Sequence, residues 1–492
     1  MADDNGALTS DENQLEPKPL DKFLALQKEL GVGLGVDQRN EALLFIETKK
    51  GLRQYPIWSR GAKETLARLI YQKTNKIPGD EHLKIILRMF AAIAEESEQH
   101  SLEPRIAEHA DAIYVNLDGD KAVRINREGW SIQKPPRPLF RYHPNQKSLH
   151  TPERVGADVR LVNRFVNLSN DKMRLMFLCH LIACLVPGIP ISIIVVTGTH
   201  GATKTTYTRV WKRLIDPTIV EVRGSVYNVG ELALIGFQNR MLVFDNLTFV
   251  PDWLSDALCR IVTGDGYEKK ALYTNEDTIS FVMRRIIALT GINLVAERAD
   301  LLDRSIIYHL DPIPDEQRKP EKQFWAEFNE VAPRILGGIF DTLVKAIQIE
   351  PTLQLAKLPR MADFARWGCA IAIALGHTAE EFLDAYAENV VRQNEAALDA
   401  SVVAQALIKF MSRPVNATGW TGSPSDLLGS LDAAAYQLGI DSHTKGWPKT
   451  PNWLMRKLRE VAPNLEKIGF KIEERRTASD RIVTIKTYNS KA

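Results

Sequence analysis

Apolar positions in the first third of the chain follow a helical period and then a strand period. Between about residues 20 and 102 apolar residues recur every three or four positions, as in residues 62–71 and 82–90, which predicts helices. From residue 105 to 132 the apolar runs shorten and turn-forming residues separate them, which predicts short strands. We therefore expect a disordered polar leader over residues 1–20 and a mixed α+β domain over residues 21–150.

In the middle of the chain, apolar strands alternate with helical segments. Residues 191–197 predict a buried strand and residues 205–214 a helix. Short apolar runs at residues 219–222, 241–244 and 285–289 predict further strands. This alternation is typical of a parallel sheet covered by helices on both faces. We therefore expect a multidomain α/β protein whose central domain spans residues 151–345.

The last third predicts helices and a small terminal domain. The pattern stays helical from Pro320 to about Met411, which predicts a helical domain over residues 346–415. Residues 419–424 have the composition of a linker. Two or three helices and then a strand pair at residues 470–473 and 481–485 follow. This order predicts a winged-helix domain over residues 420–492.

Composition narrows the class of protein. The chain has 492 residues, of which 45% are hydrophobic and 25% charged, so a wholly disordered, collagenous or disulfide-stapled protein is excluded. Lys and Arg number 63 against 61 Asp and Glu, so the net charge of +2 does not itself predict nucleic-acid binding. None of the four cysteines is in a CxxC pair, which argues against a zinc knuckle. With no secretion signal and no apolar run long enough to span a bilayer, we expect a cytoplasmic protein with no membrane partner.

The strand predicted at residues 191–197 leads into a glycine-rich turn that is typical of a phosphate site. The P-loop pattern is G-x-x-x-x-G-K-[ST], and here Gly198 opens it, Lys204 and Thr205 close it, and Thr203 replaces the last glycine. Backbone N–H groups at a helix N-terminus favour phosphates, Lys204 would reach the β- and γ-phosphates, and Thr205 would bind Mg²⁺. Alternatively, the turn only joins a strand to a helix. The predicted nucleotide-binding residues are Gly198, Thr199, His200, Gly201, Ala202, Thr203, Lys204, Thr205 and Thr206.

A second candidate residue ends the strand predicted at residues 241–244. Asp245 is a carboxylate in the position that holds Mg²⁺ beside a P-loop. Asn246 follows, where many ATPases place a glutamate that polarises the attacking water. An amide can orient water but cannot accept its proton, so hydrolysis would be slow or would need another base. The alternative for Asp245 is a helix-cap or turn residue.

The order of segments after Asp245 resembles a known family. The segments are residues 258–266, 269–274, 279–281, 290–293 and 300–308. Together with the P-loop they are similar to the AAA+ ATPase core of superfamily 3 and minichromosome-maintenance-like DNA helicases. The resemblance is closest to the replication helicases and primase-helicases of phages and mobile genetic elements. It covers about residues 161–310 with specific motifs and extends more weakly beyond them.

The resemblance implies roles for further residues. Asn293 falls where the family has its sensor-1 asparagine, and Arg304 falls where minichromosome-maintenance proteins carry an arginine finger that acts on the neighbouring subunit's ATP. A finger in trans requires assembly, so a ring, and specifically a hexamer, is expected. Lys269 and Lys270 lie in the segment that matches a hairpin gripping single-stranded DNA in the ring pore. The alternatives are a strand cap for Asn293, a salt bridge for Arg304 and a solvated hairpin edge for the lysines.

Flanking segments add weaker candidates. The helical domain would be the lid of the family, and Arg360 and Arg366 could touch the nucleotide or be ordinary helix-surface arginines. From Asp441 onward, twelve basic residues face six acidic ones, a net charge of +6. An amphipathic helix at residues 450–463 would enter a major groove and the strand pair would contact the backbone. The predicted duplex-binding residues are Arg456, Lys457, Arg459, Arg475 and Arg476, and the alternative is a protein-interaction domain with a solvated basic face.

We therefore expect an ATP hydrolase that uses ATP and Mg²⁺, namely a DNA helicase or translocase in the replication of a phage or mobile element. The catalytic residues would be Lys204, Asp245, Asn246, Asn293 and Arg304, with Thr205 and Asp245 binding the metal. Two other classes stay open. One is an ATP-dependent switch or defence protein that does not unwind DNA, and the other is an initiator that uses ATP as an assembly signal. The N-terminal domain would be a DNA-binding or collar domain.

Overall fold

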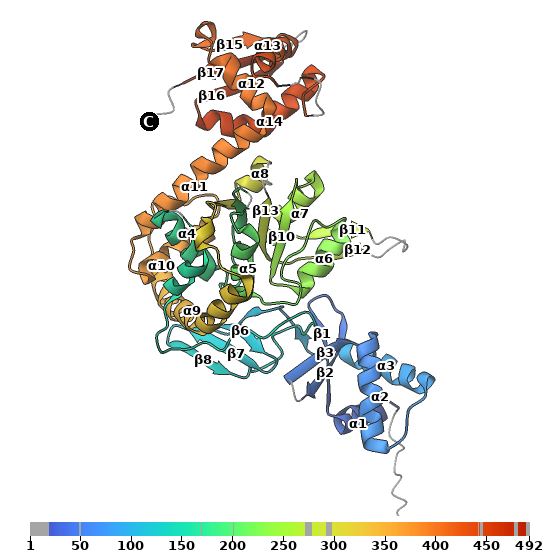
Figure 1. Ribbon diagram of the computed structural model, residues 1–492. Helices are drawn as coiled ribbons and strands as arrows, with labels where there is room; N and C mark the ends of the chain where they lie inside the picture. Colours follow the sequence, from blue (N-terminus) through green and yellow to red (C-terminus); the bar gives the residue numbers. More distant parts are fainter. Residues whose placement is uncertain are drawn as a thin grey trace, which may run out of the picture. The chain divides into compact units, whose positions relative to one another are not determined.

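The computed structural model describes residues 19–48, 51–168, 170–199, 201–270, 278–291, 298–440, 442, 446–476 and 481–488. The chain divides into two compact units, and Figure 1 labels many of their helices and strands. The first unit comprises Met1–Glu103, Asp118–Asp120 and Pro135–Tyr142, and the second comprises Pro104–Leu117, Lys121–Lys134 and His143–Ala492. The expected domain boundaries near residues 150, 345 and 415 stay predictions.

The first unit combines three helices with a small sheet. The helices are α1 (Pro19–Leu30), α2 (Arg60–Thr74) and α3 (Asp80–Glu95), and the strands are β1 (Val32–Asp37), β2 (Ala42–Thr48), β3 (Gly51–Pro56) and β4 (Gln99–His100). The sheet order is β3-β2-β1-β4, with β4 parallel to β1 and the other pairs antiparallel. The two helices expected at residues 62–71 and 82–90 are confirmed.

The helical pattern expected throughout residues 20–102 is wrong for residues 32–56, which form β1, β2 and β3. Glycines at positions 31, 33 and 35 disfavour a helix, and Gly31 and Asn40 have positive φ angles of 64° and 60°, which suit turns. Between these breaks, the apolar residues of β2 pair with β1 and β3. Local backbone preference therefore outweighed the apparent helical period here.

The second unit begins with the strands expected between residues 105 and 132. They are β5 (Ile106–His109), β6 (Ala112–Asp118), β7 (Lys121–Asn126) and β8 (Gly129–Gln133), in the order β5-β6-β7-β8. Their buried residues, including Val115, Val123 and Ile125, belong to the main hydrophobic cluster of the second unit. The long helix α9 (Glu321–Ile349) packs against this sheet, and the indole N–H of Trp130 donates to Asp341 Oδ1 at 2.8 Å.

A parallel sheet forms the centre of the second unit, as the alternating pattern predicted. Its strands are β9 (Ile193–Thr197), β10 (Met241–Leu247), β13 (Ile286–Gly291) and β14 (Ser305–His309), in the order β10-β13-β9-β14. The nearby helices are α4 (Asp171–Ala183), α5 (Lys204–Ile215), α6 (Val229–Gln238), α7 (Asp252–Thr263) and α8 (Ala299–Leu302). A separate antiparallel pair is formed by β11 (Tyr267–Lys270) and β12 (Thr278–Phe281), and η1 (Val159–Phe165) precedes α4.

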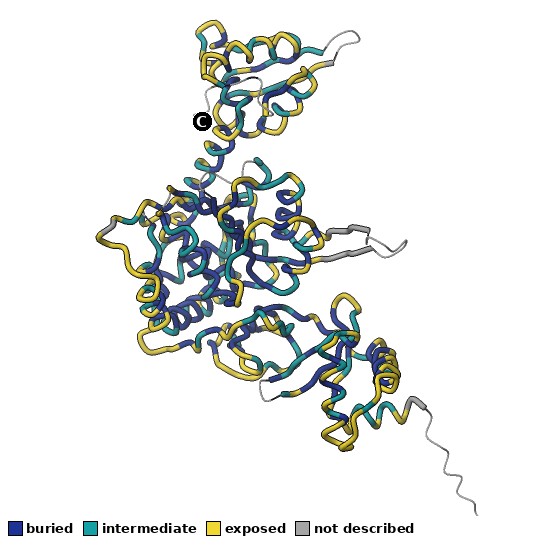
Figure 2. Tube along the Cα trace, turned by 45° about the vertical axis from the view of Figure 1, so that its right-hand side comes forward, coloured by how far each residue is buried: buried dark blue, intermediate teal, exposed yellow. Residues whose placement is uncertain are grey.

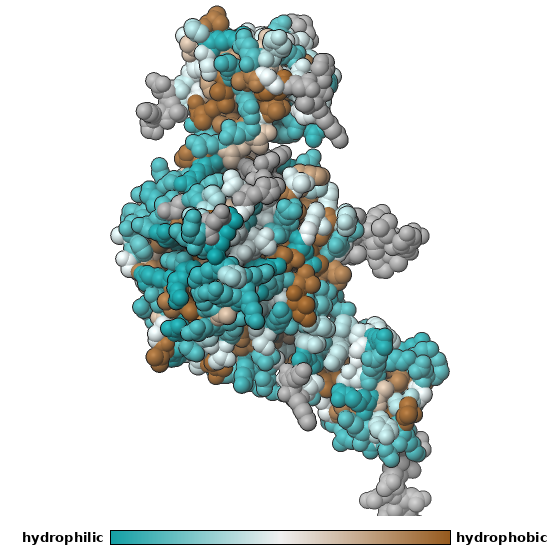
Figure 3. All heavy atoms as spheres, in the orientation of Figure 1, coloured by the Kyte–Doolittle hydropathy of each residue, from teal (hydrophilic) through white to brown (hydrophobic). Residues whose placement is uncertain are grey.

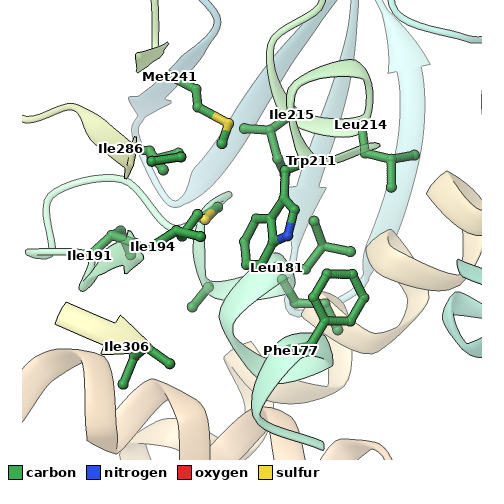
Figure 4. Close-up of a cluster of buried hydrophobic side chains, with 14 of the residues drawn as sticks. Phe177, Leu181, Ile191, Ile194, Trp211, Leu214, Ile215, Met241, Ile286 and Ile306 are labelled. Carbon is green, nitrogen blue, oxygen red and sulfur yellow. The ribbon is translucent and has the colours of Figure 1, made fainter. Parts of the chain in front are cut away.

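Close packing fixes α5 on this sheet. Figure 4 shows the indole of Trp211, from α5, among side chains of all four parallel strands and of α4. Trp211 is fully buried, as are Phe177 of α4 and Ile194 of β9. Figure 2 shows that buried residues concentrate in this sheet and in the helices around it. Because α5 follows the glycine-rich turn, its packing also fixes where that turn ends.

The strand expected at residues 219–222 is wrong. The backbone N–H groups of Ile219 and Val220 donate to Asn145, which lies outside the parallel sheet, and both apolar side chains are exposed. Only Arg223 reaches the sheet, through an isolated parallel bridge to Phe244 of β10. The apolar run therefore belongs to a surface connection, which a period-based prediction cannot distinguish from a short strand.

Helices follow the central sheet, as expected after Pro320. They are α9, α10 (Ala362–Ala374), α11 (Ala379–Ala400) and α12 (Val402–Met411), with short 3-10 turns at η2 (Asp315–Gln317), η3 (Glu350–Thr352) and η4 (Pro414–Asn416). None of the helices in the described part of the chain combines the length and apolar character needed to cross a membrane. On the face shown in Figure 3, hydrophilic residues predominate and apolar ones form small separate patches.

The C-terminal segment has its own hydrophobic cluster. It contains β15 (Trp420–Gly422), α13 (Pro424–Gln437), α14 (Pro451–Lys467), β16 (Phe470–Arg476) and β17 (Arg481–Thr487). The expected helices and strand pair are confirmed. The linker expected at residues 419–424 is wrong, because β15 pairs with β17 and Ser423 caps α13 with Pro424 in its first turn. Gly and Pro serve there as strand-end and helix-start residues.

A buried carboxylate joins α5 to the parallel sheet. Asp216 follows α5 and is fully buried, and its Oδ2 accepts hydrogen bonds from Lys212 Nζ at 2.8 Å and from the backbone N–H groups of Arg240 and Met241 at 2.8 and 3.1 Å. Its Oδ1 accepts from Arg105 Nε at 3.3 Å. Burial alone would raise the pKa of Asp216, but the charges of Lys212 and Arg105 outweigh it and hold that pKa below its ordinary value.

We expect Asp216→Ala to lower the free energy of unfolding by about 3–5 kcal/mol, because it leaves two buried cations without their anion. Urea denaturation at pH 7 measures this loss. Asp171→Ala is the matched control, because Asp171 pairs with Arg174 at 2.7 Å but is 96% exposed, and its loss should cost less than about 1 kcal/mol. Equal losses in the two variants would contradict a central role for Asp216.

Candidate phosphate-binding site

The glycine-rich turn between β9 and α5, residues 198–203, is the candidate phosphate loop, and its described backbone adopts conformations that favour glycine. Gly198 and Gly201 have φ angles of 147° and 81°, which L side chains rarely adopt. A Cβ atom on Gly198 would lie 2.5 Å from the carbonyl oxygen of Leu310, so only glycine fits there. Thr203 stands where the P-loop pattern has its last glycine, and it adopts a left-handed conformation with φ 57°. The departure from the pattern therefore keeps the glycine-like backbone at the cost of local strain.

Lys204 lies across this turn. It is the first residue of α5, and its Nζ donates to the carbonyl oxygens of Gly198 at 2.6 Å and Thr199 at 3.0 Å. The ammonium group is therefore held at the turn. Ala202 is buried beneath the turn and Thr206 is half-buried on α5, whereas His200 lies outside the described residues.

The carboxylate of Asp245, two residues before the end of β10, meets the start of α5, as the sequence predicted. Thr205 Oγ1 lies 2.9 Å from Asp245 Oδ2 and 3.1 Å from Oδ1. Thr205 comes from the helix after the turn and Asp245 from β10, so two segments 40 residues apart supply neighbouring oxygens. Hydroxyl and carboxylate oxygens are ligands that suit Mg²⁺.

Thr290 is a residue that the sequence reasoning missed. It lies in β13, which separates β9 from β10 in the sheet, and its hydroxyl donates to Asp245 Oδ1. The same Thr290 oxygen accepts the backbone N–H of Asn246 at 3.0 Å. Asn246 has a left-handed backbone with φ 55° and an exposed side chain. Thr290 therefore fixes both Asp245 and the residue after it.

These residues fit a magnesium nucleotide better than a metal held by the protein alone. Within the described residues no group of three or more His, Cys, Asp and Glu could hold a metal ion. Mg²⁺ is usually bound through one or two carboxylates together with substrate phosphates and water. Thr205 and Asp245 could supply the protein ligands of such a site, and Asn293, the expected sensor residue, lies outside the described residues.

Arg304 lies at the amino end of the parallel strands, whereas the phosphate loop lies at their carboxyl end. It precedes β14, and its carbonyl oxygen accepts the N–H of Ile193, the first residue of β9. The phosphate loop follows the last residue of β9, and five strand residues at ~3.3 Å each separate the two edges by roughly 16 Å. Its guanidinium donates to the carbonyl oxygen of Asp300 at 2.8 Å. Arg304 therefore does not reach the phosphate loop of its own chain.

The two candidate lid arginines are engaged elsewhere. Arg360 pairs with Asp303 at 2.6 Å, next to Arg304. Arg366 pairs with Glu350 and donates to the carbonyl oxygens of Glu350 and Leu353. The structure therefore does not bring either arginine to the phosphate loop.

Lys269 and Lys270 lie on a hairpin, in the last two positions of β11. They pair in register with Ile279 and Thr278 of β12. The hairpin that the resemblance implied is thus present in the backbone, while the side chains of both lysines lie outside the described residues.

The basic residues of the C-terminal segment are partly neutralised within it. On α14, Arg456 and Lys457 pair with Glu460 at 3.6 and 2.9 Å, and Arg459 pairs with Glu474 of β16 at 3.0 Å. The Arg456 side chain is 74% exposed, more than that of Lys457 or Arg459, so of these three cations it is the most accessible to a ligand in solvent. The last two residues of β16 are Arg475 and Arg476, which places them at the hairpin end, as expected.

Comparisons with solved structures add little to this geometry. Three structures of the NrS-1 C terminal region have 11–12% sequence identity to this chain and TM-scores of 0.39–0.40. The superpositions cover 96% of this chain and 100% of that chain. No curated protein matches the chain.

Two family models match in sequence. Residues 159–393 match the model described as "Actinomycete integrative conjugative element replication protein", and residues 403–492 match the model of the C-terminal domain of the same RepA proteins. The first match contains the phosphate loop, Asp245 and Thr290, and the second contains α14 and the β16–β17 hairpin. Over these residues the chain belongs to the replication proteins of actinomycete integrative conjugative elements, and it is a replication protein of a mobile element.

Proposed function

We propose that this replication protein is an ATP-dependent DNA helicase or translocase that works as an oligomeric ring. The observation that carries the proposal is the convergence of Lys204, Thr205 and Asp245 at the carboxyl edge of the parallel sheet. Those three residue types in that arrangement are what a P-loop ATPase needs. The resemblance to AAA+ helicases of superfamily 3 supports the finer assignment.

The geometry suggests how the chain would bind a nucleotide. The loop N–H groups and the N-terminus of α5 would cradle the phosphates, and Lys204 would exchange the carbonyl oxygens of Gly198 and Thr199 for phosphate oxygens. Thr205 and Asp245 would hold Mg²⁺, which supplies positive charge to the β- and γ-phosphate oxygens. Asn246 would orient the attacking water but could not accept its proton.

Arg304 and Asn293 complete the proposed catalytic set. Because Arg304 lies at the edge of the sheet opposite to its own phosphate loop, it could act only on the nucleotide of a neighbouring chain. A guanidinium supplied in trans stabilises charge on the transferred phosphoryl group. This requirement favours a closed ring, for which we propose a hexamer. Asn293 would contact the γ-phosphate or its water.

Two surfaces would bind DNA in this proposal. The hairpin that carries Lys269 and Lys270 would contact a single strand in the ring pore. The C-terminal segment would act as a winged helix, since its helices α12, α13 and α14 share a hydrophobic cluster with the sheet of β15, β16 and β17. Arg456 would be its main phosphate contact on α14, with Arg475 and Arg476 at the hairpin. Such binding would weaken as the salt concentration rises.

One observation favours a second candidate function. Asn246 stands where many ATPases have a catalytic glutamate, so turnover could be too slow for translocation. In that case ATP would serve as an assembly signal for an initiator that binds DNA without unwinding it.

We expect Lys204→Ala to abolish DNA-stimulated ATP turnover and the unwinding of a forked duplex, because it removes the cation that meets the β- and γ-phosphates. Phosphate release and strand displacement measure the two activities. Lys172→Ala is the control, because Lys172 pairs with Glu388 on the surface at 3.3 Å. Normal turnover in Lys204→Ala would refute the phosphate site. Turnover and DNA binding by the wild type without strand displacement would favour the initiator.

We expect Thr290→Val to weaken binding of ATP with Mg²⁺ by about tenfold, because it removes a hydrogen bond to a charged carboxylate. Titration calorimetry measures the dissociation constant. Thr342→Val is the matched control, since its buried hydroxyl donates to the carbonyl oxygen of Gly338 within α9. Unchanged affinity in Thr290→Val would mean that Asp245 does not depend on Thr290 for its position.

We expect Arg304→Ala and Lys204→Ala each to be inactive alone and partly active when mixed. A mixed ring contains interfaces where an intact phosphate loop meets an intact Arg304. Phosphate release over a series of mixing ratios, with light scattering to confirm mixed assembly, measures the recovery. Mixed rings without any recovery would argue against a finger in trans.

A further inference from the structure

The segment that joins β14 to α9 runs past the phosphate loop and is anchored on both elements that flank the loop. At its start, the N–H of Leu310 donates to the carbonyl oxygen of Thr197, the last residue of β9, at 2.9 Å. At its end, Glu321 accepts a hydrogen bond from Arg209 of α5 at 3.0 Å. Because the loop connects β9 to α5, these two anchors hold the segment beside it.

Arg318 extends from this segment to the loop. Its Nη2 lies 3.1 Å from the point where a Cβ atom of Gly201 would be, which places the guanidinium directly against the loop backbone. Its Nε donates to the carbonyl oxygen of Ile313 at 3.3 Å, within the same segment. The next residue, Lys319, turns away and pairs with Glu327 of α9 at 2.6 Å. Of these two adjacent cations, only Arg318 is directed to the loop.

We propose that Arg318 is a second cation of the nucleotide site, supplied by the same chain that supplies Lys204, and that it binds the phosphates of the bound nucleotide. This inference rests on the proposed function. A triphosphate with one Mg²⁺ still carries negative charge, and Lys204 is a single positive charge. A guanidinium can bind phosphate oxygens through two parallel hydrogen bonds, which an ammonium cannot do.

Gly201 has a particular role in this arrangement. A side chain at that position would meet the Arg318 guanidinium at 3.1 Å and would require a left-handed backbone at φ 81°. Glycine therefore lets the guanidinium approach the loop where phosphates would bind. Arg318 differs in this from Arg304, which lies at the opposite edge of the sheet and would serve a neighbouring chain.

Binding of ATP with Mg²⁺ to the full chain, measured by titration calorimetry, tests the inference. We expect Arg318→Ala to raise the dissociation constant about tenfold or more, because a hydrogen-bonded charge is lost, and Arg318→Lys to recover part of this loss. Lys319→Ala is the matched control and should change the constant less than twofold. The thermal unfolding midpoint without nucleotide, measured for both variants, shows how far each substitution also disturbs the fold, since Arg318 bonds to Ile313 and Lys319 pairs with Glu327.

The possible results distinguish failure of the role proposed for Arg318 from failure of the proposed ATP-dependent function. If Lys204→Ala loses ATP binding while Arg318→Ala matches Lys319→Ala, the proposed function stands and the role of Arg318 is overturned. If Arg318→Ala lowers the unfolding midpoint and Arg318→Lys restores both the midpoint and the full wild-type affinity, Arg318 acts through the fold and the inference is overturned as well. If the wild type does not bind ATP at all, the proposed function fails and this inference fails with it.

Discussion

The candidate site depends on one buried carboxylate, Asp216. Its carboxylate accepts hydrogen bonds from Lys212, near the end of α5, and from the backbone N–H of Met241, the first residue of β10. It also accepts a hydrogen bond from Arg105, which directly precedes β5. The opposite ends of α5 and β10 carry the residues that would meet the nucleotide, Lys204 and Thr205 on the helix and Asp245 on the strand. By fixing the far ends of both elements, this interaction sets the spacing of the near ends. A buried ion pair adds little net stability over an apolar replacement, but the loss of one partner is costly, so the two elements stay tied while all partners of Asp216 are present.

The sequence predicted those parts of the site that have local signals. Glycines followed by Lys204 and Thr205 after an apolar run, and an acid at the end of the next long strand, need no knowledge of the fold. Thr290 could not be found in this way, because a hydroxyl at the end of an apolar strand is common and only the strand order places it between β9 and β10. Arg318 was missed for the same reason, since its approach to Gly201 depends on where the segment before α9 is anchored.

The errors in the fold have a similar origin. Ile219, Val220 and Val222 are apolar and β-branched, yet the backbone N–H groups of Ile219 and Val220 donate to Asn145 and both side chains are exposed. The segment is therefore a surface connection and not the predicted strand. In residues 32–56 closely spaced glycines and a turn at Asn40 outweighed an apparent helical period. Residues 419–424 have linker composition, but their Gly and Pro end a strand and begin α13. In each case the sequence showed the character of the individual residues correctly. It did not show which distant residues their backbone groups would bond to.

The location of Arg304 at the edge of the sheet opposite to the loop has a genetic consequence under the proposed function. No single chain would contain a complete catalytic centre, because each centre would take residues from two copies of the chain. An inactive variant expressed beside the normal protein would then enter mixed rings and impair the centres that it shares with normal copies. Such a variant would interfere dominantly with propagation of the element. Two differently damaged alleles could, by the same geometry, complement each other within one cell.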